Sequence, residues 1–80
     1  MTLALTLSAV GANTQVRIEQ ITDVDTEMMM MRMGILPGDT IQVLSTIPNG
    51  AVVIEFNGQE LALGQVFAMH ILTTTLSSTV

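Results

Sequence analysis

The stretch Met33-Gly34-Ile35-Leu36-Pro37-Gly38-Asp39 decides more about the fold than any other part of this sequence. Gly34 is placed to end a helix in the left-handed conformation, which glycine adopts without steric cost. Pro37 cannot continue that helix, and Gly38 favours a tight turn. We expect a strand to leave the turn at residues 40–44. The stretch therefore predicts a helix end, a turn and a strand start in close succession.

Apolar alternation predicts four more strands on either side of this turn. They cover residues 16–21, 52–56, 61–63 and 69–75. The first of them has an irregularity near Gln20, where the alternation of apolar and polar residues breaks. Asn57-Gly58 separates two of the strands and is a strong signal for a two-residue hairpin turn. Short strands joined by short connections therefore dominate the predicted structure.

The five predicted strands and one small inserted helix favour a compact antiparallel barrel, because the connections are too short for parallel crossovers. The pattern alone leaves an SH3-like barrel, an OB-like barrel and a small sandwich as alternatives. At the N-terminus, Leu3, Leu5 and Leu7 alternate with smaller residues, which is the period of a strand or extended segment. The length of 80 residues predicts a single domain, residues 1–80.

The charge balance argues against two classes of partner. Two basic residues stand against seven acidic ones, which gives a formal net charge of −5. This charge repels phosphate backbones and anionic lipid headgroups, so we expect no binding to nucleic acid or to membrane surfaces. The chain has no cysteine, which excludes disulfides, thiolate metal sites and thiol nucleophiles. No apolar run approaches the roughly 18 residues of a membrane helix. The expectation is a cytoplasmic protein without membrane insertion.

The predicted helix, residues 27–33, is rich in methionine. Its methionines are Met28, Met29, Met30, Met31 and Met33. They cannot all face the core, because consecutive helical residues are about 100° apart. Three interpretations stay open: the side chains fill gaps between helix and barrel, the exposed ones form a pliable patch for a partner, or their thioethers bind a metal. Thioethers favour soft Cu(I), whereas ferrous iron prefers nitrogen and oxygen ligands.

The polar residues form no catalytic motif. Alternation from Ile71 places His70, the single histidine, on the solvated outer face of the last strand. Asp23, Asp25 and Glu27 are spaced as in a calcium loop, but the glycine and the final glutamate of that motif are missing. A capped and negatively charged helix N-terminus explains them better. We therefore predict a protein that is not an enzyme and has no cofactor, with weak binding of Fe²⁺ or another divalent ion left open.

One family pattern covers most of the chain, from about Leu7 to Thr73. Its positions are Leu7-Ser8, Gly11, Val16, Ile18, Met30, Met31, Met33, Gly34-Ile35, Pro37-Gly38, Gly58, Leu61, Ala62, Leu63, Ala68 and Ile71. With these residues the chain resembles the FeoA family, ferrous iron transport protein A. The resemblance implies an SH3-like barrel with an inserted helix. The sequence departs from the family at Gly64-Gln65 and Met28-Met29, where basic residues are common, which argues against a basic contact surface.

The resemblance also implies a function. It implies a cytosolic accessory protein of bacterial ferrous iron uptake that binds the cytosolic domain of the FeoB membrane transporter and modulates the transporter. We expect the contact at Met28, Met29, Arg32 and Ile35, in the exposed part of the helix and the turn after it. Two other classes stay open. One is a metal-sensing module like the C-terminal barrel of diphtheria-toxin-repressor-type proteins, and the other is a self-assembling domain that forms homo-oligomers.

Overall fold

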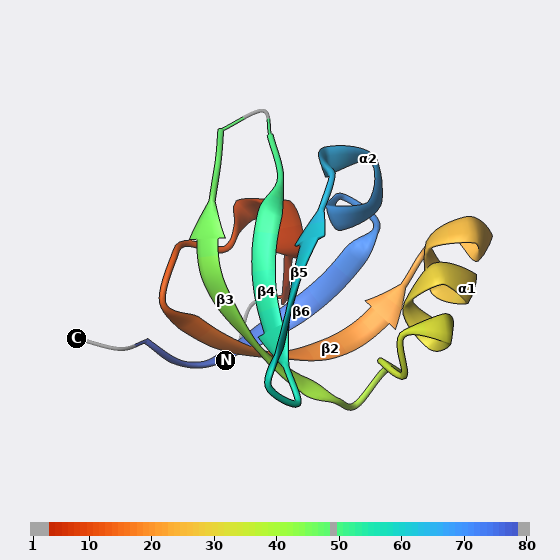
Figure 1. Cartoon of the computed structure of the whole chain (residues 1–80), viewed down its shortest axis with the longest axis horizontal. Helices are drawn as coiled ribbons and strands as arrows, with labels where there is room; N and C mark the ends of the chain where they lie inside the picture. Colours follow the sequence, from red (N-terminus) through yellow and green to blue (C-terminus); the bar gives the residue numbers. More distant parts are fainter. Residues whose placement is uncertain (1–3, 49, 79–80) are drawn as a thin grey trace.

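The structure is a computed structural model that describes residues 4–48 and 50–78. In chain order the elements are β1 (Ala4–Thr6), η1 (Leu7–Ala9), β2 (Thr14–Ile21), α1 (Val24–Arg32), β3 (Thr40–Thr46), β4 (Val52–Phe56), β5 (Gln59–Leu63), α2 (Gln65–Ala68) and β6 (Ile71–Ser78). The strands form one antiparallel sheet in the order β1-β6-β2-β3-β4-β5. The sheet curls into a small SH3-like barrel, and α1 lies at one side of it (Figure 1). The predicted mainly β fold with an inserted helix is confirmed.

Strand β2 lies between β6 and β3, and an irregular pairing allows its unevenly spaced apolar residues to share one face. Val16 and Ile18 are fully buried on one face of the strand. Ile21 lies three residues after Ile18, so strict alternation would turn its side chain outward. The pairing with β6 shifts between Ile18 and Gln20, which returns Ile21 to the core. The irregularity predicted near Gln20 is therefore confirmed, together with its physical reason.

The hairpin between β4 and β5 also follows the prediction. Asn57 has a φ of 51° and Gly58 a φ of 79°, so both central residues are left-handed. This pair of conformations belongs to the type I′ turn, whose twist matches that of the two flanking strands. Phe56 and Gln59 are paired directly beside the turn. The Asn57-Gly58 signal therefore fixes the register of the whole hairpin.

Three short elements extend or differ from the predicted set. Of the three leucines expected in an N-terminal strand or extended segment, Leu5 lies in β1, which is a sixth strand. Leu7 belongs to η1 and is buried. Leu3 lies outside the described residues. Helix α2 was not predicted. The turn that follows it occupies Met69 and His70, so β6 begins at Ile71 instead of residue 69 and continues to Ser78. The backbone amide of Ala68 donates to the carbonyl of Gly64 at 2.9 Å, which closes the single turn of α2.

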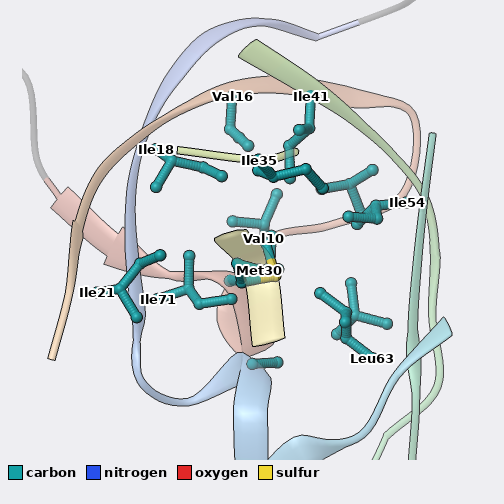
Figure 2. Packing of buried hydrophobic residues seen from close by; sticks show 14 residues of the cluster. Val10, Val16, Ile18, Ile21, Met30, Ile35, Ile41, Ile54, Leu63 and Ile71 are labelled. Carbon is teal, nitrogen blue, oxygen red and sulfur yellow. The ribbon is translucent and has the colours of Figure 1, made fainter. Parts of the chain in front are cut away.

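The core lies inside the curled sheet and receives side chains from the helix side as well. Its buried members are Leu7, Val10, Val16, Ile18, Ile21, Met30, Ile35, Ile41, Val43, Val52, Ile54, Leu63, Ala68 and Ile71. Figure 2 shows Met30, Val10 and Ile35 in the space that the strands enclose. α1 and the turn after it are therefore anchored to the barrel by Met30 and Ile35. This anchoring decides which parts of α1 face solvent.

Candidate interaction surface on α1

The N-terminus of α1 is capped by Asp23. Its Oδ2 accepts hydrogen bonds from the Thr26 backbone amide at 3.0 Å and from the Thr26 hydroxyl at 2.8 Å. These bonds hold the pKa of the Asp23 carboxyl below its ordinary value, the hydroxyl contributing most and the amide next. Asp25 and Glu27 lie in the first turn and Arg32 in the last, the distribution that the helix dipole favours. The capping role expected among these residues is confirmed for Asp23.

The C-terminus of α1 ends in a Schellman motif. The Gly34 amide donates to the Met31 carbonyl at 2.9 Å, and the Ile35 amide donates to the Met30 carbonyl at 2.9 Å. Gly34 has a φ of 81°, as the helix end predicted for it requires. The motif usually joins two apolar side chains at these positions, and here Ile35 and Met30 are both fully buried in the core. The helix end thus attaches α1 to the barrel.

The turn after the motif is closed by Asp39. Its Oδ2 accepts from the Leu36 amide at 2.8 Å, and its own amide donates to the Leu36 carbonyl at 3.0 Å. The Gly38 amide donates to the Ile18 carbonyl at 2.7 Å, so the turn is also bonded to β2. These bonds fix where β3 begins. They also give α1 a defined position beside the barrel.

The methionines of α1 divide into buried and exposed ones, as predicted. Met30 is fully buried, and Met29 and Met33 pack partly against the core. Met28 is 46% exposed and Met31 is 55% exposed. Together with Val24, which is 69% exposed, they follow the spacing i, i+4, i+7 that places residues on one helix face. We call these three residues, Val24, Met28 and Met31, the α1 stripe.

The four residues expected to contact a partner lie in different environments. Met28 and Arg32 are exposed, whereas Met29 is half-buried against the core. The assignment of Ile35 to this surface is wrong, because its side chain is fully buried next to Met30. The prediction did not include Val24 and Met31, which are exposed on the same helix. Their i, i+4, i+7 spacing with Met28 is a signal that the sequence already contained.

His70 does not lie on the outer face of the last strand, and that prediction is wrong. It lies in the turn between α2 and β6, where its amide donates to the Phe67 carbonyl at 3.0 Å, and its side chain is half-buried. The Thr22 amide donates to the His70 carbonyl at 2.8 Å, and the Thr22 hydroxyl lies 3.4 Å from His70 Nδ1. This contact joins the turn after α2 to the residues that precede α1.

Chemical groups for a metal or a substrate are sparse in residues 4–48 and 50–78. Within them, no three His, Asp or Glu side chains gather in a way that could hold a metal ion. Asp23 is engaged as a helix cap, which accounts for its place in the acidic cluster. The same residues form no pocket. Among the described helices none is long and apolar enough to cross a membrane.

The fold and its inserted helix define the class of small SH3-like barrel domains. Within this class, the FeoA domain model matches residues 5–74. The chain therefore belongs to the FeoA family, which links it to ferrous iron transport. Domains of this family are accessory rather than catalytic ones. The family predicted from the spaced positions is confirmed.

Solved structures agree with this assignment. An iron uptake regulatory protein, FeoA, has 28% sequence identity and a TM-score of 0.83, with 92% of this chain and 99% of that chain covered. A FeoA-like protein from Clostridium acetobutylicum has 24% identity and a TM-score of 0.83, with 100% and 95% covered. ScaR with bound Zn²⁺ has 24% identity and a TM-score of 0.81, but only 37% of its chain is covered, so this likeness concerns the fold alone. No curated protein sequence matches this chain.

Proposed function

We propose that this chain is a cytoplasmic accessory protein of bacterial ferrous iron uptake that binds the cytosolic domain of a FeoB-type transporter and modulates it. The observation that carries the proposal is membership of the FeoA family over residues 5–74. The proposal includes no catalytic step and no resident cofactor. We expect any binding of Fe²⁺ to be weak; within residues 4–48 and 50–78 no three His, Asp or Glu side chains gather in a way that could hold the ion.

The α1 stripe is the contact that we propose for the transporter. Methionine side chains adapt their shape to a partner, and Met28 and Met31 hold theirs in solvent beside Val24. Arg32 is exposed at the end of the same helix and supplies a positive charge at the rim of the stripe. An apolar centre with a polar rim is the usual anatomy of a protein interface. Met29 contributes at its exposed edge only, and Ile35 not at all.

Titration calorimetry tests the proposal with the purified cytosolic domain of the transporter from the same organism. Titrations with and without Fe(II) and a guanine nucleotide identify the ligand that the association needs. We expect saturable binding by the unmodified chain. Heat from Fe(II) and this chain alone, with no heat from the transporter domain in any condition, would replace the proposal by a metal-sensing module.

Substitutions then test the surface. Met31→Glu and Met28→Glu should each weaken the association at least about tenfold, because a charge is placed in the centre of the contact. Ile47→Glu is the matched control: Ile47 is 54% exposed, close to the 55% of Met31, but lies beyond the end of β3. Melting curves must show that all three variants fold. Equal affinity for the Met31 and Ile47 variants would exclude the α1 stripe as the contact.

A further inference from the structure

Strand β5 has an edge without a neighbouring strand in the part of the chain that the structure describes. It pairs with β4 only. Since the two-residue turn makes Phe56 and Gln59 a hydrogen-bonded pair, the backbone groups of Leu61 and Leu63 also face β4. The N–H and C=O groups of Glu60 and Ala62 then point away from the sheet. None of the hydrogen bonds between described residues uses these groups.

The outer face of this edge carries an uncompensated pair of carboxylates. Glu55 and Glu60 are directly opposite each other in a non-hydrogen-bonded pair, the arrangement that brings side chains closest. Both are exposed. The chain has only two basic residues. Arg17 is already paired with Glu19 at 2.8 Å, and Arg32 lies in the last turn of α1. Like charges in this position are destabilising, so a cation beside Glu60 would be bound favourably.

The inner face of the same edge is apolar. Leu61 is half-buried and packs against the core from the rim, as does Phe56 on β4. Successive side chains of a strand point to opposite faces of the sheet. A strand placed beside β5 would therefore have every second side chain against Leu61 and the others beside Glu60. A segment in which apolar and basic residues alternate would therefore match both faces of the edge.

We propose that the free edge of β5 binds an extended segment of a partner protein, alternating in apolar and basic residues, by addition of a strand to the sheet. Main-chain hydrogen bonds to Glu60 and Ala62 would hold the segment, and the charge of Glu55 and Glu60 would select it. A second copy of this chain suits the edge less well, because its own β5 brings two more carboxylates and its net charge is −5. This site is separate from the α1 stripe and does not depend on the transporter as partner.

The probe is a capped peptide, Val-Thr-Val-Lys-Val-Thr-Val, titrated into the full ¹⁵N-labelled chain. Its valines can lie against Leu61 while its lysine lies beside Glu60. We expect the Glu60 and Ala62 amides to gain protection from hydrogen exchange in the complex. The Leu61 amide serves as internal control, since it is already bonded to β4 and should change little. A peptide with glutamate in place of lysine should bind on the order of tenfold more weakly, because it adds a third carboxylate.

Two changes remove the main-chain bonds without altering the charge. Ala62→Pro deletes an N–H that points outward, so the pairing with β4 is kept, and binding should weaken at least about threefold. Methylation of the peptide nitrogens that face β5 should have the same effect and leaves the protein untouched, which covers the case that the proline variant is unstable. Glu60→Lys should reverse the preference between the lysine and glutamate peptides.

Three results would overturn the proposal. The first is the absence of any chemical-shift change with the lysine peptide at millimolar concentration. The second is a shift that maps to α1 while the Glu60 and Ala62 amides stay unprotected. The third is protection of these amides that rises with protein concentration alone, which would identify a second copy as the occupant. None of these results bears on the association with the transporter, which is tested separately by titration calorimetry.

Discussion

Met30 and Met31 are sequence neighbours in opposite environments, so substitution of each by alanine tests the orientation of α1. Met30 is fully buried and Met31 is 55% exposed. Removal of a buried methionine side chain costs about 2–5 kcal/mol, including the cavity that it leaves. Met31→Ala should cost at most about 1 kcal/mol, because less than half of its side chain leaves a packed environment. Chains of this size have a total stability of roughly 4–12 kcal/mol, so Met30→Ala removes a large share.

Urea unfolding followed by circular dichroism measures both variants. The midpoint should fall much further for Met30→Ala, and its melting temperature should drop by at least about 8 °C. Met30→Leu is the control, since a change that conserves volume should cost less than about 1.5 kcal/mol. If both alanine variants lost the same stability, or if Met31→Ala lost more, α1 would be rotated on the barrel and the α1 stripe would not exist as described.

The other expected outcomes concern the helix ends and the edge of the sheet. Hydrogen bonds from Thr26 lower the pKa of Asp23, so they stabilise the fold at neutral pH. This contribution is lost as the pH falls through the lowered pKa. The urea midpoints of Asp23→Ala and of the unmodified chain should therefore differ at pH 7 and converge well below pH 3.8. Gly34→Ala should lower the free energy of unfolding in urea by about 1–2 kcal/mol, because the φ of Gly34 is 81°. Gly11→Ala is the control and should cost less than half as much, because Gly11 has no positive φ and a Cβ there meets open space. Glu60→Lys should raise stability by about 0.5 kcal/mol in the same assay by relieving like-charge repulsion, and a loss would contradict the cross-strand geometry.

The sequence predicted best where a few neighbouring residues determine the backbone. The left-handed Gly34 and the positive φ values at Asn57 and Gly58 follow from local sterics alone. The irregularity near Gln20 follows from the spacing of two isoleucines that must share one face. None of these features depends on a distant part of the chain. Together with the strand spacing they favoured a compact antiparallel barrel with one inserted helix, and the resemblance to the FeoA family selected the SH3-like form among the alternatives.

Features that depend on contacts between distant segments were missed. α2 has only four residues, too few for a helical period to show, and it contacts η1 near the other end of the chain. The unpredicted turn of α2 moved His70 off the strand. Ile35 was expected on the surface because turn residues are usually exposed. The Schellman motif instead pairs it with Met30, and the apolar residue directly after Gly34 is a signal that identifies this contact.

The orientation of α1 shows why a run of methionines cannot be divided by composition. Every residue from Met28 to Met31 is equally suited to a core, so hydrophobicity does not distinguish them. Only Thr26 and Met30 are buried on this helix, at the spacing i, i+4, and they fix its rotation. Thr26 is polar, and its burial is possible because its hydroxyl donates to Asp23. The cap and the buried face are therefore one structural unit, which places Val24, Met28 and Met31 outward.

The two proposed surfaces differ in chemistry, and this difference allows them to be separated in a single binding assay. Contact through the α1 stripe is mainly apolar, so its affinity should change little with salt and should fall when Met28 and Met31 are oxidised to polar sulfoxides. Contact through the edge of β5 depends on Glu55 and Glu60, so its affinity should fall as salt screens the basic segment and should be insensitive to oxidation of α1. A partner that responds to both treatments binds both surfaces at once.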